Sequence, residues 1–162
     1  STGGYTLQSQ PMNGPYTRHW WGIPKECAAC HVHEEPYGGP QQPVNSGHTF
    51  QANRRACLPC HNEATATVLI EMTREEIETR LAAVARRYDP ADPLYVDPAL
   101  IPPPDLPAYQ AATFNYRFVQ ADRSLGAHNS PYARALLDET ELFFGIPPWR
   151  SAGPGVDGGM DP

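Results

Sequence analysis

Two five-residue stretches, Cys27-Ala-Ala-Cys-His31 and Cys57-Leu-Pro-Cys-His61, contain every cysteine of this 162-residue chain. In each, two thiols stand three positions apart and a histidine follows directly. This C-x-x-C-H spacing is the attachment signature of c-type haem, because both sulfurs reach one edge of a porphyrin and the histidine can then ligate the iron. The sequence therefore predicts two covalently bound haems. The predicted attachment residues are Cys27, Cys30, Cys57 and Cys60, and the predicted proximal ligands are His31 and His61.

Two other uses of the cysteine pairs compete with haem. A zinc site with four cysteine ligands also draws on two C-x-x-C pairs, but zinc does not require a histidine after each pair. An exported chain could instead form two structural disulfides, although C-x-x-C loops are strained and more often redox-active. The colour of the preparation separates these interpretations, since haem makes it red.

The composition favours a fold built around a cofactor. Leu, Ile, Val and Phe make up roughly 17% of the residues, below the level expected of an ordinary core. The 19 prolines and 13 glycines together form about a fifth of the chain. Such a chain either stays largely disordered or folds around apolar surface that it does not encode. We expect a mainly α fold with extensive coil, a small multihaem c-type cytochrome organised around two covalent haems.

The chain is expected to form one domain over residues 1–162, with three parts. Residues 1–72 predict a loop-rich half that wraps the haems, with a short helical turn at each C-x-x-C-H motif. Residues 73–144 predict a helical half, and residues 145–162 an extended tail. The tail is rich in proline and glycine, so its order would have to come from packing against the haem surface or another copy.

Three helices are predicted in the second half. Thr73 and Glu76 form a capping box, followed by an apolar stripe through Ile77, Leu81, Val84 and Tyr88. Residues 89–107 hold seven prolines and predict an extended surface connector.

The second helix is predicted to start near Pro107 and to be interrupted at Gly126. Ser130 and Pro131 predict the cap and first turn of a third helix, which runs to about Phe144. Leu136, Leu137, Phe143 and Phe144 are its predicted inner residues.

Charge and hydropathy limit the partners. The formal net charge is −6, and no basic face is present to neutralise phosphates, so nucleic acid is not an expected partner. A redox protein with a basic patch is a better electrostatic match. Covalent haem attachment implies export, and the start at Ser1 without an apolar leader predicts a mature periplasmic, extracellular or surface protein. No stretch is apolar enough to span a membrane.

Each iron needs a second strong axial ligand, and four histidines remain. His48 lies nine residues before Cys57, and His128 lies at the junction of the second and third helices; both are predicted distal ligands. His19, beside two tryptophans, is the alternative, whereas His33 follows His31 too closely to reach over the same haem. Thioether ligation by Met12, Met72 or Met160 is a further alternative, disfavoured by the placement of these residues. The aromatic residues predicted to pack on the haem faces are Trp20, Trp21, Tyr37, Phe50, Phe114 and Phe118.

The segment from Tyr116 to Leu137 (YRFVQADRSLGAHNSPYARALL) resembles the helix pair found late in multihaem c-type cytochromes related to the pentahaem nitrite reductases and the doubled C-x-x-C-H group. In those families a Gly-x-His-Asn junction supplies a distal haem ligand, which implies this role for His128. The segment Gly47-His-Thr-Phe50 before the second motif is also similar to such proteins and implies His48 as a ligand. The resemblance covers about residues 47–144.

This chain departs from that pattern in two ways. It has only two haem motifs, and it lacks the lysine-bearing motif of the nitrite reductase active site. The resemblance therefore implies electron transfer and argues against nitrite chemistry. A second resemblance, to the small dihaem subunit of periplasmic nitrate reductases, implies His19 and His48 as the distal ligands instead.

We expect electron transfer between bis-histidine haems and no enzymatic activity. One version of this function is a protomer of an extracellular haem-chain filament, in which the Pro- and Gly-rich ends contact neighbouring copies. The alternatives are a shuttle or electron-donating subunit for a periplasmic oxidoreductase, and a haem enzyme with one five-coordinate iron. Optical spectra distinguish the enzyme, because a five-coordinate haem is high-spin and binds carbon monoxide.

Overall fold

The described residues form three long α-helices and one short α-helix, which coincides with the first C-x-x-C-H motif. The computed structural model describes residues 4–6, 8, 11–12, 14–15, 22–23, 27–32, 52 and 54–149. In chain order the α-helices are α2 (Cys27–His31), α3 (Glu63–Ala85), α4 (Leu106–Asp122) and α5 (Ser130–Phe144). Short 3-10 turns are η1 (Arg54–Cys57), η2 (Pro98–Leu100) and η3 (Pro103–Asp105). The described residues form no strand beyond an isolated bridge between Tyr5 and Pro11. The mainly α fold predicted from the sequence is thereby confirmed at this level.

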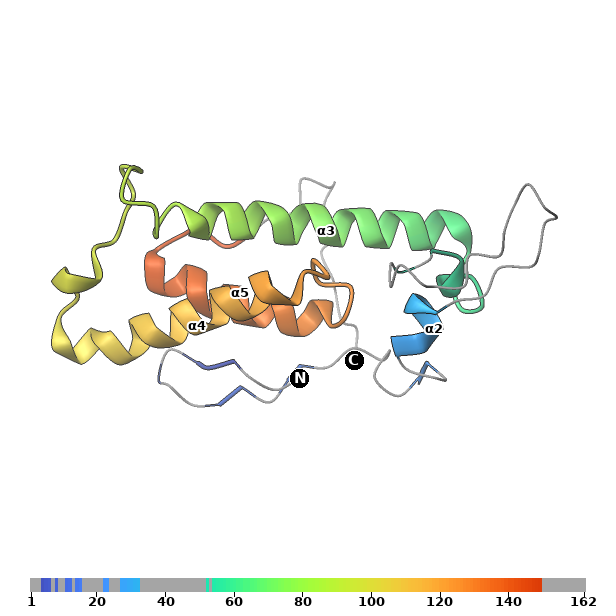
Figure 1. The fold of residues 1–162 in the computed structure, drawn as a ribbon, viewed down its shortest axis with the longest axis horizontal. Helices are drawn as coiled ribbons and strands as arrows, with labels where there is room; N and C mark the ends of the chain where they lie inside the picture. Colours follow the sequence, from blue (N-terminus) through green and yellow to red (C-terminus); the bar gives the residue numbers. More distant parts are fainter. Residues whose placement is uncertain are drawn as a thin grey trace, which may run out of the picture.

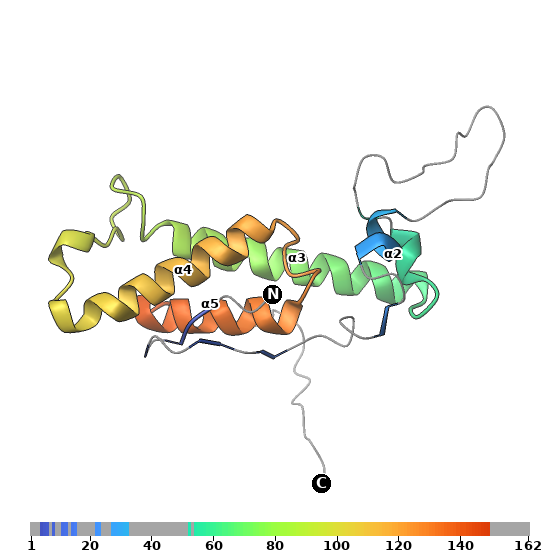
Figure 2. The ribbon, with the colours of Figure 1, turned by 60° about the horizontal axis from the view of Figure 1, so that its bottom comes forward.

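Helix α3 extends from the helical core to the second C-x-x-C-H motif. Its 23 residues span about 35 Å. The part nearer its C-terminus packs on α4 and α5, and the part nearer its N-terminus runs past them towards α2 and the second haem motif (Figures 1 and 2). Among the described residues, no helix combines the length and hydrophobicity that crossing a bilayer requires.

The predicted start of this helix at Thr73 is wrong by ten residues. The N-cap is Asn62, whose side-chain oxygen accepts a hydrogen bond from the Thr65 amide at 2.8 Å. The carboxylate of Glu63 in the first turn interacts favourably with the positive end of the helix dipole. Neither glycine nor proline interrupts the helix. The apolar spacing of residues 63–72 does not predict a helix, because several of their apolar side chains are exposed and form no stripe towards the core.

Helices α4 and α5 agree more closely with the prediction. Helix α4 starts at Leu106 with Pro107 in its first turn, and α5 ends at Phe144. The cap of α5 is Asn129, whose side chain accepts from the Tyr132 amide, so the prediction of Ser130 as the cap is wrong by one residue. Helix α4 also ends before the predicted Gly126, since Arg123 adopts a left-handed conformation with φ of 54°.

The core lies where the three long helices meet. Ile77 from α3, Val119 from α4, and Tyr132, Leu136 and Leu137 from α5 form one buried cluster. The predicted stripe on α3 is confirmed for Ile77 and Val84, which are fully buried. The predicted extended connector is instead a series of turns that contains η2 and η3, because Asp89, Asp92 and Asp97 accept hydrogen bonds from amides two residues on.

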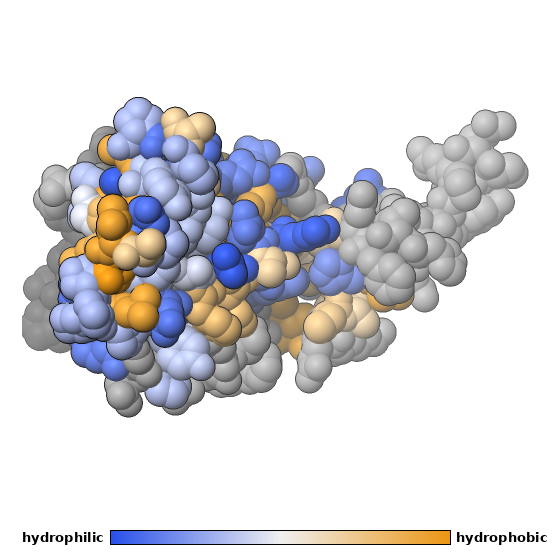
Figure 3. Space-filling model, turned by 60° about the vertical axis from the view of Figure 1, so that its left-hand side comes forward, coloured by the Kyte–Doolittle hydropathy of each residue, from blue (hydrophilic) through white to orange (hydrophobic). Residues whose placement is uncertain are grey.

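Three leucines along the connector and at the start of α4 are exposed. Leu94, Leu100 and Leu106 keep 37%, 79% and 38% of their surface in solvent. Figure 3 looks onto this end of the molecule, where apolar side chains are interspersed with hydrophilic ones.

The described N-terminal residues Gly4, Tyr5 and Met12 contact α4 and α5. The buried Asn115 side chain pairs with both backbone groups of Tyr5, accepting from its amide at 2.7 Å and donating to its carbonyl at 2.6 Å. The Tyr132 hydroxyl accepts from the Gly4 amide and donates to the Met12 carbonyl, each at 2.9 Å. This part of the predicted haem-wrapping half is therefore held by α4 and α5.

A cluster of charges joins α3 to α5. The Arg80 guanidinium, only 3% exposed, donates two hydrogen bonds of 2.8 Å to the buried carboxylate of Glu141 and a third to Asp138. Burial by itself lowers the pKa of Arg80, but these hydrogen bonds outweigh it and raise the pKa above its usual value. Glu76, predicted to cap a helix, instead pairs with Arg80 and Arg134. The cluster fixes α5 against α3.

Replacing Arg80 with alanine leaves the Glu141 carboxylate buried without its cation. We expect the free energy of unfolding to fall by about 3–5 kcal/mol. Arg74→Ala is the matched control, because the exposed Arg74–Glu78 pair contributes less than about 1 kcal/mol. Urea unfolding followed by far-ultraviolet circular dichroism measures both. Equal losses in the two variants would contradict the structural role of the buried cluster.

Candidate haem-binding site

The first motif forms one turn of helix. Cys27 and Cys30 lie at the two ends of this turn in α2, so their thiols share one side of it, and His31 closes the helix. The Cys27 side chain is exposed and that of Cys30 is half-buried. The helical turn predicted for this motif is confirmed. It places both sulfurs on the same side, as attachment to one edge of a porphyrin would require.

The second motif forms a similar turn without a full helix. Cys57 ends η1, and its carbonyl accepts hydrogen bonds from the amides of Cys60 at 3.2 Å and His61 at 2.9 Å. The last of these bonds is the five-residue turn of an α-helix. All four cysteines are free thiols. The described residues contain no group of three or more His, Cys, Asp or Glu side chains placed to hold a metal ion, as a zinc ribbon would.

The two motifs lie against each other. Helix α2 contacts η1, and η1 in turn contacts α3 (Figure 1). Burial raises the pKa of the Cys30 thiol, and the nearby thiols of Cys57 and Cys27 raise it further. Haems attached at the two motifs would therefore be close neighbours.

The structure brings one proximal ligand and one predicted distal ligand together across a long sequence separation. The imidazole rings of His31 and His128 have centroids 6.0 Å apart and planes inclined by 58°. Two imidazoles that ligate one iron from opposite faces, each through a bond of about 2 Å, have centroids about 6 Å apart. Either ring can rotate about the ligand axis, so the inclination is compatible with this arrangement. The pair thus fits the spacing of two axial haem ligands.

Hydrogen bonds orient the His128 ring. Its Nδ1 lies 2.7 Å from a carboxylate oxygen of Asp122, and its backbone amide donates to the Ser124 hydroxyl at 3.3 Å. The Ser124 hydroxyl also hydrogen-bonds to Asp122. With Nδ1 facing a carboxylate, Nε2 is the ring nitrogen left to ligate a metal.

The loop that carries His128 is held against α3 by a close backbone contact. Arg123, Leu125 and Gly126 all have positive φ angles, of 54°, 50° and 86°, and turn the chain sharply between α4 and α5. A Cβ atom on Gly126 would lie 2.8 Å from Thr73 Cγ2 and 3.2 Å from Ile77 Cγ1. Only glycine allows this approach at this φ angle. The contact sets the position of His128 along α3.

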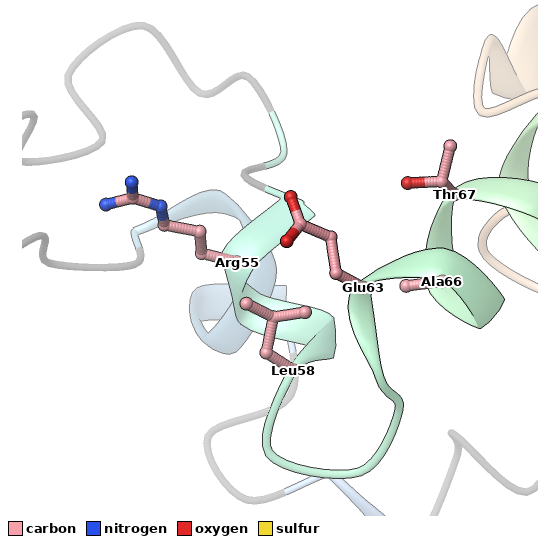
Figure 4. Close-up of a pocket in the computed structure, with 5 residues that line it drawn as sticks. All are labelled: Arg55, Leu58, Glu63, Ala66 and Thr67. Atoms are coloured by element: carbon pink, nitrogen blue, oxygen red, sulfur yellow. The ribbon is translucent and has the colours of Figure 1, made fainter.

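Apolar side chains are exposed at both motifs. Val32, directly after the first motif, and Leu58, inside the second, expose 43% and 41% of their surface. Val68, Leu69 and Met72 in the first half of α3 expose between 50% and 54%. Figure 4 shows a shallow hollow between η1 and the first turns of α3, lined by Arg55, Leu58, Glu63, Ala66 and Thr67. Exposed apolar side chains beside four thiols suit a porphyrin, which would cover them with apolar surface of its own.

Some of the other predicted ligands lie within the described residues and some lie outside them. His61 is half-buried at the end of the second motif. His48, His19 and His33 lie outside the described residues, as does Met160. Met12 packs against the helical core, which makes it unavailable as a ligand, and Met72 is exposed on α3.

Of the aromatic residues predicted to pack on the haem faces, two lie within the described residues. Phe118 packs against the core and contacts Tyr132, and Phe114 contacts Phe118 and Tyr5. Protein side chains therefore cover part of the Phe118 ring, whereas Phe114 keeps 43% of its surface exposed. Trp20, Trp21, Tyr37 and Phe50 lie outside the described residues.

Two groups of contacts were not predicted from the sequence. Asp122 and Ser124 support His128, and their spacing of six and four residues before a histidine at a helix junction is the only signal that sequence reasoning could have used. The close approach of Gly126 to Thr73 depends on tertiary packing and has no local signal.

Substituting Gly126 with alanine tests whether this close approach positions the ligand loop. We expect a loss of more than about 1 kcal/mol in the free energy of unfolding and partial high-spin character at one haem, because the loop must move away from Thr73. Gly145→Ala is the matched control: Gly145 has a positive φ of 62°, but a Cβ atom added to it would meet no other atom within 4 Å. This control should carry the backbone strain alone and leave the haem spectrum intact. Identical behaviour of the two variants would refute the positioning role.

No protein-family description, curated protein or solved structure matches the chain. The resemblance of residues 116–137 to multihaem cytochromes therefore remains a prediction from sequence. The functional conclusion rests on the two motifs and on the pairing of His31 with His128.

Proposed function

We propose that this chain is a dihaem c-type cytochrome that transfers electrons. Cys27 and Cys30 hold the first haem, and His31 and His128 ligate its iron. The second haem is held by Cys57 and Cys60, with His61 as its proximal ligand. His48 is its proposed distal ligand, and His19 is the alternative.

One observation carries this proposal. The His31 and His128 rings are 97 positions apart in sequence, yet their centroids lie 6.0 Å apart, beside the two thiols of the first motif. A surface histidine in a helix junction has no structural need for such a neighbour. The separation matches two axial ligands of one iron, and the hydrogen bond of His128 Nδ1 to Asp122 prepares the other nitrogen for ligation.

Ligation from both sides favours electron transfer over catalysis. A bound haem would supply a one-electron couple at its iron. With His31 and His128 both available as ligands, the chain would leave no iron position open to a substrate at the first haem, and the same ligands would serve both oxidation states. Histidine in place of a methionine thioether keeps the reduction potential low.

The surroundings of the site support transfer between two haems and to a partner. Helix α2 packs on η1, so electrons would pass directly between haems attached at the two motifs. The chain carries a formal charge of −6, which favours redox partners with a basic patch. The attachment chemistry implies a protein outside the cytoplasm, in the periplasm or at the cell surface.

Replacing His128 with alanine should convert one of the two haems to a high-spin form that binds carbon monoxide. The covalent attachment does not depend on the distal ligand, so the mass should still include two haems. Optical and electron paramagnetic resonance spectra measure the first effect, and mass spectrometry of the intact chain measures the second. His33→Ala is the control and should leave both haems low-spin.

Three results would contradict the proposal. A native chain without two haem adducts would remove its basis. Carbon monoxide binding by the unaltered protein would favour the enzyme alternative. Two low-spin haems in the His128→Ala protein would remove His128 from the ligand set.

The ligand of the second haem is tested by a parallel pair of variants. We expect His48→Ala to make the second haem high-spin and His19→Ala to leave it unchanged. Spectra of the double variants with His128→Ala separate the two irons, because both haems then become high-spin only if the ligands serve different irons. The opposite result for His48 and His19 would assign His19 as the ligand.

A further inference from the structure

The carboxylate of Asp122 lies at the centre of a small hydrogen-bonded ring. One of its oxygens is 2.7 Å from His128 Nδ1, and the other binds the Ser124 hydroxyl. That hydroxyl accepts a hydrogen bond from the His128 backbone amide. Asp122 therefore contacts the His128 ring directly and its backbone through Ser124.

We propose that Asp122 is a positioning residue that orients His128 towards His31 and lowers the reduction potential of the haem attached at Cys27 and Cys30. This inference rests on the proposed function of the pair. It adds an element that the ligand set itself does not contain, namely a carboxylate that determines which ring nitrogen carries the proton and how strongly the other nitrogen donates.

The chemistry follows from the hydrogen bond. A carboxylate that accepts the Nδ1 proton keeps Nε2 unprotonated and makes it a more basic ligand. A more basic ligand stabilises ferric over ferrous iron, and second-shell hydrogen bonding is an established means of tuning a haem. In the part of the chain that the structure describes, Asp122 forms no ion pair with lysine or arginine, so no cation in an ion pair competes with His128 for its charge.

The place of Asp122 in the fold argues against a purely structural role. It is the last residue of α4, where the helix dipole presents its negative end and disfavours a carboxylate. No basic residue in the last turn of α4 offsets this repulsion. Asparagine would suit this end of the helix better. A carboxylate is therefore kept at a position where it does not favour the helix, next to a proposed ligand.

Asp122→Asn tests the inference, since it removes the charge and keeps the shape. We expect the ferric preference of one haem to fall about tenfold, which for a one-electron couple raises its potential by about 59 mV. The other haem should keep its potential. Stability should stay the same or rise slightly, because a charge unfavourable to α4 is removed. Spectroelectrochemical titration measures the potentials, and urea unfolding measures the stability.

The control is Asp105→Asn at the other end of α4, about 25 Å away along the helix. It makes the same change in net charge, but its carboxylate lies at the N-terminal end, forms no capping hydrogen bond and contacts no proposed ligand. Both potentials should remain unchanged in this variant. Asp122→Glu should restore part of the native potential, because it returns the charge.

Several outcomes would overturn the inference. One is a potential shift in Asp122→Asn no larger than in Asp105→Asn. Another is an equal shift of both haems, which indicates a long-range effect of charge. A third is a loss of stability without a change in either potential, which indicates a structural role. The His128→Ala spectra keep this failure separate from failure of the proposed function, because they show independently whether His128 ligates an iron.

Discussion

The spacing between the His31 and His128 rings is the constraint on which the rest of the structure depends. These rings belong to segments that have no continuous helix in common: one ends the short α2, and the other lies in the turn between α4 and α5. Helix α3 links the two segments, one directly and the other through η1. Its N-terminal part contacts η1, which contacts α2, and its middle receives Gly126 of the turn at Thr73. Helix α3 and η1 thus bring two remote segments together as one proposed ligand pair.

The division of α3 explains where the stability comes from. Around Ile77 and Val84 it buries an ordinary apolar face against α4 and α5, reinforced by the Arg80–Glu141 pair. Towards its N-terminus it exposes Val68, Leu69 and Met72. The helical part therefore has its own core, and the described motif part lacks one. This agrees with the proposal that a chain poor in aliphatic residues would complete its apolar interior with a bound porphyrin.

Local signals predicted much of this fold. Pro107 and Pro131 locate the starts of α4 and α5 because proline fits the first helical turn, and the buried faces of α5 follow its apolar spacing. The sequence pattern does not predict the start of α3, because most of its first ten residues are exposed and only Ala66 among them is buried, so their apolar residues form no helical period. The pairing of Asn115 with Tyr5 and of Arg80 with Glu141 could not be foreseen, since each joins residues more than 60 positions apart. For the site, the motifs predicted the haem-binding thiols and the proximal histidines, and these roles remain proposals, whereas the approach of His128 to His31 depends on the tertiary packing of α3, α4 and α5.

An experimental structure of the haem-bound protein tests the central claim most directly, through the two axial atoms on the iron of the haem attached at Cys27 and Cys30. We predict Nε2 of His31 on one face and Nε2 of His128 on the other. An iron on that haem with a different sixth ligand, or with none, would contradict the claim.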